Sequence, residues 1–532
     1  MSVLSLKRIR LIAALVLFFT ALFYFTGSFQ LLPENVFSWI TDIQFIPALL
    51  LVFKGSIVAI LILAAIIILT LLFGRVYCST ICPLGIYQDV VIRFKKWIVK
   101  NVRFKYKKGS PLIHYSVSAL VFILFFTGIT AALILLDPYS NFGRMAADTF
   151  KVPFIHLNNL SSRILQGMGI YNLNPVNYKV AFLSLIYATA FTIIISILAW
   201  WRGRFFCNYI CPVGGVLSIL ARFSFFKLKI NEASCTSCGL CLHNCKAECI
   251  NIKEKTIDSS RCINCYNCIN TCTNQGIDYV FSTVKLNKRD TQKEASNRRQ
   301  VFSKSIGLGL GLISLPALAQ YPKEENSEDV VHWEHRGKSH GGINYSDKGI
   351  VTPPGSYSLE HFNDNCTACH LCVAKCPSNV IQPTFSEYGL ANMLQPKMDY
   401  NLSYCNFNCT VCGDVCPTGA IVPLSQEEKH VCQLGKVNFA RNYCVVVTEG
   451  TSCGSCSEHC PTQAVHMVPF GDNLTIPVIN PDICIGCGAC EYACPVQVPH
   501  KAIFVVANTL HQVADKPKVD EVEFNTEEDF PF

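Results

Sequence analysis

The sequence predicts a helical membrane domain joined to several small, cysteine-rich α+β domains. Three observations lead to this fold class. The chain has 532 residues, of which 51% are hydrophobic, and this is too apolar for a wholly soluble protein of several domains. Long uncharged runs fill its N-terminal part. Most of its 30 cysteines stand in closely spaced runs further along the chain.

Four apolar runs are expected to cross a membrane as helices, because each is long enough for a hydrocarbon core of roughly 30 Å. They cover residues 11–32, 43–73, 112–136 and 180–201. The loop over residues 74–110 carries nine basic residues and one acid, Asp89, which places it in the cytoplasm by the positive-inside bias. We therefore expect a four-helix domain over residues 1–221 with its N-terminus inside. The net charge of +8 is explained by this topology, so no nucleic-acid partner is expected.

A twelve-residue motif occurs twice, at the inner ends of the second and fourth runs. Residues 74–85 and 203–214 both read G-R-x-aromatic-C-x-x-I-C-P-aliphatic-G. The cysteines of the two copies are Cys78, Cys82, Cys207 and Cys211. If the copies pack as pseudo-symmetric neighbours, these thiols could hold a shared metal or iron–sulfur centre, or act as redox-active dithiols. The alternative is a structural turn at each helix end, since glycine and proline follow each pair under either interpretation.

Two cysteine runs follow within residues 222–285, each with the spacing C-x-x-C-x-x-C-x-x-x-C. Such a run gives three thiolates to one 4Fe-4S cluster and its fourth to a second cluster, as in bacterial ferredoxins. We expect one cytoplasmic cluster on Cys235, Cys238, Cys241 and Cys272, and another on Cys262, Cys265, Cys268 and Cys245. Lys246 and Thr273 replace the proline that usually follows each run, and Cys249 is left over as a buried thiol. Zinc is the competing metal.

Residues 286–320 resemble an export signal. Arg298 and Arg299 precede an apolar stretch over 306–319 that ends in small residues, which is typical of a twin-arginine signal. The alternative is a fifth transmembrane helix. Both place the following chain outside the cytoplasm. A polar linker over 321–358 carries three histidines that we expect to be solvated.

Four further runs occupy residues 359–515, ahead of an acidic tail over 516–532. Their sixteen thiolates predict four periplasmic 4Fe-4S clusters, and so six clusters in the chain. The ligands of run one are Cys366, Cys369, Cys372 and Cys376, and those of run two are Cys405, Cys409, Cys412 and Cys416. Run three has Cys444, Cys453, Cys456 and Cys460, and run four has Cys484, Cys487, Cys490 and Cys494. The fourth cysteines pair either run one with four and two with three, or neighbouring runs, and the spacing leaves both open. Cys432 is left over.

The segment Cys366–His370 also matches the C-x-x-C-H pattern of haem attachment. Haem would leave Cys372 and Cys376 without a role, although they complete a regular cluster run. We therefore expect a cluster here, with His370 as a chance occupant of a variable position.

These motifs resemble two families. Residues 1 to about 285 are similar to NapH-type membrane ferredoxins in their four spans, two C-x-x-x-C-P motifs and two-cluster module. Residues about 290 to 510 resemble NapG-type periplasmic ferredoxins in the twin-arginine signal, Pro353-Pro354-Gly355 and four cysteine runs. The resemblance implies a fusion that acts as a quinol dehydrogenase in the bacterial inner membrane. It would take electrons from the quinone pool to a periplasmic reductase or cytochrome partner within a larger complex.

Two other functions stay open from the sequence. The chain could be a transmembrane conduit from a cytoplasmic donor within a respiratory complex. It could also be a metal reductase or assembly factor of the copper-oxidase accessory type. Asp137, Asp148 and His156 in the outer loop are candidate proton acceptors for a quinol, although solvated loop residues are the simpler expectation.

Overall fold

The computed structural model describes most of the chain in one of two units. The described residues are 3–26, 37–99, 102–281 and 345–516, apart from short gaps at 108, 110, 172–174, 177, 179–180, 472 and 498. All elements below belong to the unit formed by residues 1–281 and 342–532. The predicted twin-arginine stretch, the three linker histidines and the acidic tail lie outside the described residues.

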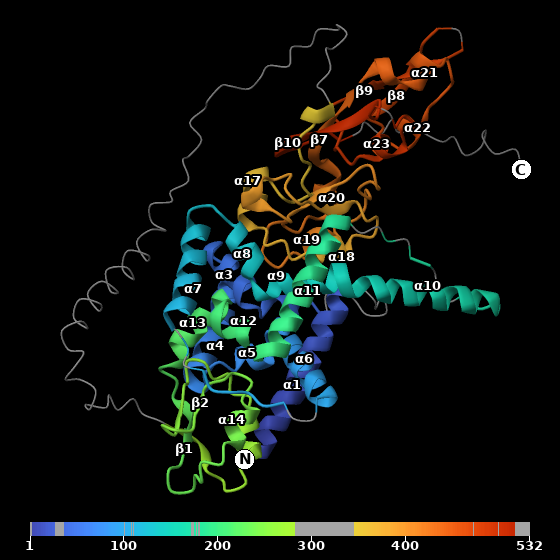
Figure 1. Cartoon of the computed structure of the whole chain (residues 1–532). Coiled ribbons are helices and arrows are strands. Elements are labelled where there is room, and N and C mark those ends of the chain that lie inside the picture. The colour runs from blue at the N-terminus through green and yellow to red at the C-terminus, as the bar shows by residue number, and fades with distance from the viewer. Residues whose placement is uncertain are drawn as a thin grey trace, which may run out of the picture. The chain divides into compact units, whose positions relative to one another are not determined.

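The apolar runs of the N-terminal part form helices (Figure 1). These are α1 (Val3–Thr26), α3 (Phe45–Phe53), α4 (Ile57–Phe73), α7 (Pro111–Phe126), α8 (Ala131–Leu136) and α11 (Phe182–Arg202). Among the described residues, two helices are long and apolar enough to cross a membrane by length and composition, Leu6–Thr26 of α1 and all of α11. The other two predicted spans are interrupted. Gly55, with φ +77°, separates α3 from α4, and Gly128, with φ +84°, separates α7 from α8.

Short helices carry the two copies of the repeated motif. The first copy forms α5 (Tyr77–Thr80) and starts α6 (Pro83–Ile98), and the second forms α12 (Phe205–Tyr209) and α13 (Pro212–Ala221). Proline stands at the first position of α6 and of α13, where its missing N–H has no intrahelical acceptor to lose. The cysteine before each proline is therefore the N-cap residue of the helix.

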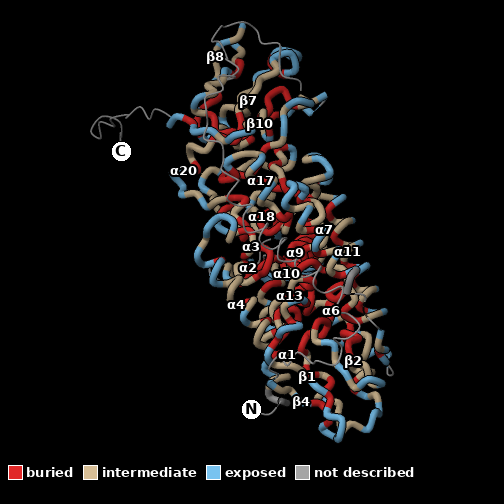
Figure 2. The backbone as a smooth tube through the Cα atoms, turned by 90° about the vertical axis from the view of Figure 1, so that its left-hand side faces the viewer, coloured by how far each residue is buried: buried red, intermediate tan, exposed pale blue. Residues whose placement is uncertain are grey.

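Between α8 and α11 the chain forms three further helices. They are α9 (Pro138–Arg144), the π-helix η2 (Met145–Phe150) and α10 (Lys151–Gly167). Asp137 begins α9, because its carboxylate accepts hydrogen bonds from the N–H groups of Tyr139 and Ser140. Buried residues gather where the helices meet, around α9 and α13 (Figure 2).

The cysteine runs fold into small α+β modules with two-stranded antiparallel sheets. In the inner module β1 (Phe226–Ile230) pairs with β4 (Ile277–Phe281), and β2 (Ile250–Asn251) with β3 (Thr256–Ile257). In the outer modules β5 (Ile381–Pro383) pairs with β6 (Pro396–Met398), β7 (Cys432–Phe439) with β10 (Ile503–Val513), and β8 (Val465–Pro469) with β9 (Thr475–Ile479). Each of the six runs contains one short helix. These are α14 (Leu240–Asn244), α15 (Asn267–Thr271), α18 (Leu371–Lys375), α19 (Val411–Asp414), α22 (Ser455–Glu458) and α23 (Ala489–Ala493).

Candidate iron–sulfur sites

The two inner runs exchange their fourth cysteines in space. Cys235, Cys238 and Cys241 line one cavity together with Cys272 of the second run. Three cysteines of the second run, Cys262, Cys265 and Cys268, line another cavity together with Cys245 of the first run. These are the two ligand sets expected from the spacing. Cys249 lines the second cavity as well.

Residues with a left-handed backbone conformation bend each inner run around its cavity. Gly239 (φ +78°) and Tyr266 (φ +57°) directly follow the second cysteine of their runs, and Ser237 and Asn264 directly precede it with φ of +55° and +48°. Such φ values are uncommon outside glycine, so the loop is held by the surrounding structure. The bent loop also turns backbone N–H groups inward, and Gly276 N–H donates to the Cys272 sulfur at 3.2 Å. Hydrogen bonds of this kind adjust the reduction potential of a cluster.

The outer runs pair as neighbours in the chain. Cys405, Cys409 and Cys412 of run two line a cavity with Cys376 of run one. Burial raises the pKa of Cys372, and the neighbouring thiolates, Cys416 among them, raise it further. Cys416, the fourth cysteine of run two, therefore lies near the cysteines of run one.

Runs three and four show the same exchange. Cys444, Cys453 and Cys456 line a cavity with Cys494. Burial and then nearby thiolates, Cys460 among them, raise the pKa of Cys490, which belongs to run four. Of the two pairings that the sequence left open, the structure therefore has neighbour with neighbour.

The cysteine sets fit a polynuclear group better than a single ion. Four of the six sets are each spread around a shared cavity. Within the part of the chain that the structure describes, no three His, Cys, Asp or Glu side chains are grouped to hold one metal ion. Four thiolates around one cavity are the donor set of a 4Fe-4S cluster, and this geometry gives no support to zinc.

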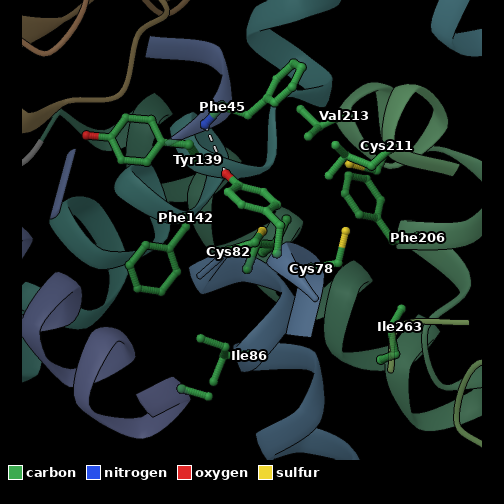
Figure 3. Close-up of a cluster of buried hydrophobic side chains, with 14 of the residues drawn as sticks. Phe45, Cys78, Cys82, Ile86, Tyr139, Phe142, Phe206, Cys211, Val213 and Ile263 are labelled. Atoms are coloured by element: carbon green, nitrogen blue, oxygen red, sulfur yellow. Dashed lines mark hydrogen bonds between the residues drawn. The ribbon is translucent and has the colours of Figure 1, made fainter. Parts of the chain in front are cut away.

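The two copies of the repeated motif converge on one buried site, which we call the cysteine quartet (Cys78, Cys82, Cys207 and Cys211). Figure 3 shows three of these side chains, Cys78, Cys82 and Cys211, in the same buried cluster. Each of the four residues is at most 5% exposed. Burial and then the charges of the other three thiols raise the pKa of Cys211, so all four lie close together.

Two arginines cross between the motif copies in a pseudo-symmetric way. Arg75 of the first copy donates to Cys207 O at 2.7 Å, and Arg204 of the second donates to Cys78 O at 2.9 Å. Each also approaches the thiol three residues further along its own copy, Arg75 at 3.9 Å from Cys78 Sγ and Arg204 at 3.7 Å from Cys207 Sγ. Both arginines are fully buried. The repeated arginine therefore links the two copies through their first cysteines.

This environment suits an anionic group held by the quartet. Arg75 Nε and Arg204 Nη2 are buried with no hydrogen-bond partner. Unpaired buried cationic donors are costly, and a nearby negative group lowers that cost. The iron–sulfide core of a cluster is positively charged, but four thiolates carry more negative charge than the core neutralises. A cluster bound by four thiolates would therefore be an anion beside these arginines. The residues present fit an iron–sulfur centre.

A buried ionic contact joins the quartet to the inner module. Asp89 on α6 receives a hydrogen bond from Arg204 Nε at 2.8 Å and contacts Lys246 Nζ. Burial alone would raise the pKa of Asp89, but Arg204 and Lys246 outweigh it and hold that pKa well below its usual range. Arg204 N–H also donates to Lys246 O at 3.0 Å. Lys246 stands where proline usually follows such a run, and its side chain and carbonyl anchor the inner run to the second motif.

The run-one loop contacts the helices through residues that the sequence led us to discount. His370 is fully buried, and its Nδ1 lies 2.8 Å from Asp148 Oδ2 on η2. Ser184 of α11 donates to the same carboxylate oxygen at 2.6 Å. The prediction of His370 as a chance occupant was wrong, and so was the expectation that Asp137 and Asp148 are solvated, since both are at most 1% exposed. His156 is exposed on α10.

Sequence reasoning missed Arg75, Arg204, Asp89 and Lys246 as parts of the site. The sequence did hold one indication, because an arginine stands at the same position of both motif copies. Asp89 was also the one acid in a strongly basic loop. The C-x-x-C-H pattern drew attention to His370, but nothing in the sequence indicated its pairing with Asp148, which is 222 residues away in the chain.

Comparison with known proteins agrees with this geometry. Residues 56–105 and 182–231, which contain the two motif copies, match a family model described as a 4Fe-4S binding domain. Residues 364–420 and 451–498 match one described as a 4Fe-4S dicluster domain. The first match covers runs one and two, and the second covers run four and all of run three except Cys444, so each match joins the two runs that exchange cysteines. The chain is thus an iron–sulfur protein with ferredoxin-type 4Fe-4S domains.

Related proteins include electron carriers. The chain is 28% identical over 228 residues to an uncharacterised protein of Methanocaldococcus jannaschii, covering 43% of this chain and 71% of the relative. It is 23% identical to YccM of Escherichia coli, named as an electron transport protein, over 45% of this chain and 58% of the relative. It is 27% identical to the ferredoxin-type protein NapF of the same species, over 26% of this chain and 74% of the relative. The chain is an iron–sulfur electron-transfer protein related to these ferredoxin-type proteins.

Proposed function

We propose that the chain is a membrane-bound quinol dehydrogenase that passes electrons through six 4Fe-4S clusters to a periplasmic reductase or cytochrome. In this proposal four helical segments cross the inner membrane, with the two-cluster module in the cytoplasm and the four-cluster modules in the periplasm. The two interrupted segments, α3 with α4 and α7 with α8, would span as broken helices. Polar backbone at such breaks is tolerated in a membrane where protein groups satisfy it.

One observation carries the proposal: a single buried core contains residues of the inner ligand sets, the quartet and the run-one site. Cys245 and Cys262 of the inner module, Cys78 and Cys82 of the quartet, and Leu371 beside Cys372 all belong to it. When bound, the clusters would accept and pass on one electron at a time. The chain's own residues fix the positions between which an electron must move, and they exclude water from that region.

Contacts on the outer side support the same route. Arg144 of α9 donates to Ala368 O at 3.0 Å, inside the run-one loop. Lys151 of α10 donates to Ala374 O at 2.5 Å, in the helical turn of the same run. The run-one site is thereby held against the helices where quinol would give up its electrons. Asp148, which contacts the same loop through His370, is our candidate proton acceptor from the quinol.

Reconstitution with menaquinol tests the proposal. Full-length protein in liposomes is mixed with menaquinol under anaerobic conditions, and cluster reduction is followed by EPR. We expect reduction by menaquinol in wild type and a large loss of that rate in a variant with both Cys78→Ser and Cys207→Ser. A reduced soluble ferredoxin supplied on the cytoplasmic side is the comparison donor. Reduction by ferredoxin with none by menaquinol would refute the quinol dehydrogenase.

The same experiment addresses a second candidate, a conduit from a cytoplasmic donor. Its supporting observation is the buried contact from the inner run through Lys246 and Asp89 to Arg204 beside the quartet. A conduit requires that ferredoxin reduce the outer clusters through the quartet. Rapid reduction of the outer clusters by ferredoxin in the double serine variant would exclude this route.

A further inference from the structure

The second inner site contains a fifth thiol that the ferredoxin pattern does not require. Cys249 lines the same cavity as Cys245, Cys262, Cys265 and Cys268. Its side chain is 2% exposed, and its sulfur lies 3.5 Å from Cys245 Sγ. Cys249 therefore belongs to the ligand shell of this site by position and not only to the surrounding core.

Other runs of the chain show that the fold does not need a thiol at this place. Cys249 stands four residues after the last cysteine of its run. The corresponding residues of the four other runs that the structure describes at this place are Gly276, Val380, Ala420 and Ala464. Small or aliphatic residues thus serve the same structural position in those four runs. An alanine at 249 would match what the chain itself uses in two outer runs.

The turn between the two thiols is fixed from several sides. Glu248 has φ +53°, and the residues at the same place of four other runs, Gln275, Asn379, Gly419 and Gln463, also have positive φ, so this turn belongs to the fold of the runs. Glu248 pairs with Arg202 at 2.8 Å, and Lys246 contacts Asp89. The side chains on either side of the turn are therefore held by the helical domain.

Both thiols are placed to reach the same corner of a cluster. Cys262, Cys265 and Cys268 supply three ligands from one loop, and each iron of a 4Fe-4S cluster takes one cysteine. Only one ligand is then still needed, and two sulfurs 3.5 Å apart face the cavity. The two cannot both bind that iron within its four-coordinate geometry, but either one is within reach.

We propose that Cys245 and Cys249 are alternative fourth ligands of the inner cluster held by Cys262, Cys265 and Cys268. The inference rests on the proposed cluster at this site, and not on quinol as the donor. When one sulfur binds as the thiolate, the other stays protonated and donates a hydrogen bond to it. In an exchange, one iron–sulfur bond breaks, the other forms, and the proton moves from the incoming to the leaving sulfur. Charge and electron count are unchanged.

Iron content of the full-length protein tests the redundancy. We compare Cys245→Ala, Cys249→Ala and the double variant with Cys265→Ala, which removes a ligand that has no substitute. Iron and acid-labile sulfide per chain are measured after anaerobic purification. Each single variant at 245 or 249 should keep wild-type iron, whereas the double variant and Cys265→Ala should each lose about four iron atoms per chain.

EPR of the reduced proteins gives a second readout that does not depend on iron loss. The wild-type signal of this cluster should be the sum of two forms, one matching Cys245→Ala and the other Cys249→Ala. Iron loss in Cys245→Ala equal to that in Cys265→Ala would overturn the proposal, as would a wild-type spectrum identical to that of either single variant. If Cys265→Ala loses no iron, the cluster assignment itself fails. That outcome is distinguishable from a failure of ligand redundancy.

Discussion

Removing the charge of Asp89 is the most direct test of how the inner module is attached to the quartet. Asp89→Asn keeps the shape of the side chain but leaves Arg204, which is fully buried, without its counter-charge. Lys246 loses the same partner. Breaking one side of a buried ion pair costs about 3–5 kcal/mol, because the remaining charge stays out of water. We expect a destabilisation of this size.

Arg204 and Lys246 hold the pKa of Asp89 well below its usual range in spite of burial. This pKa decides the pH at which the assay should be run. A depressed carboxyl pKa gives stability that is present above the unfolded-state pKa of about 3.9 and is lost as the pH falls toward the folded-state value. At neutral pH the whole contribution is therefore present. Denaturation midpoints in detergent at pH 7, followed by tryptophan fluorescence and cluster absorbance, would measure its loss.

An exposed ion pair of the same chain is the matched control. Glu387 and Lys397 approach to 3.2 Å, but both side chains are partly exposed, Glu387 to 41% and Lys397 to 29%. Such pairs contribute about 0–1 kcal/mol, so Glu387→Gln should shift the midpoint little. If Asp89→Asn shifts it no more than Glu387→Gln does, the buried contact does not hold the inner module. Adding Lys246→Met to Asp89→Asn should cost less than the sum of the single changes, because one unpaired cation is removed with the anion.

Two further predictions concern the quartet and the outer pairing. Gly85→Ala should destabilise the protein by about 1–3 kcal/mol through overpacking, because the added methyl group would overlap Cys78 O and the guanidinium of Arg204. Gly167→Ala, whose methyl group would meet nothing within 4 Å, is the control, and equal denaturation midpoints would contradict the prediction. Cys416→Ala should remove the same EPR-detectable cluster as the run-one variant Cys372→Ala, whereas Cys432→Ala should remove none. Loss of different clusters in the first two variants would show that the pairing is not between neighbours.

The spacing of the cysteines predicted the inner sites well because those contacts are local. Three ligands come from one loop of seven residues, and the turn chemistry of that loop is set by its own sequence. The internal repeat also indicated that the quartet converges, since two like helix ends must bring like residues together if they pack as neighbours. The cysteine spacing did not reveal the two arginines that contact the quartet. The arginines act across the repeat, each on the cysteine carbonyl of the other copy.

Features that depend on distant partners escaped prediction. Lys54 stands in an otherwise uncharged run, and the helix breaks there between α3 and α4. Its Nζ donates to Gly419 O at 2.7 Å, 365 residues further along the chain. The contact gives this exposed cation a hydrogen-bond acceptor in an outer cysteine module. His370 is a similar case, because its buried position is explained by Asp148 and not by the cysteine run in which it stands.

The pairing of neighbouring runs has a consequence for the path of electrons. Pairing run one with run four would have brought the end of the chain's last run to the helices. In the observed arrangement the run-one site, completed by Cys416, lies against the helical domain through Ala368 and Ala374. Cys405 N–H of run two donates to Cys487 O of run four at 2.9 Å, so the next site adjoins the second pair. Contacts thus link run one to run two and run two to run four, and Cys494 of run four shares a cavity with the cysteines of run three.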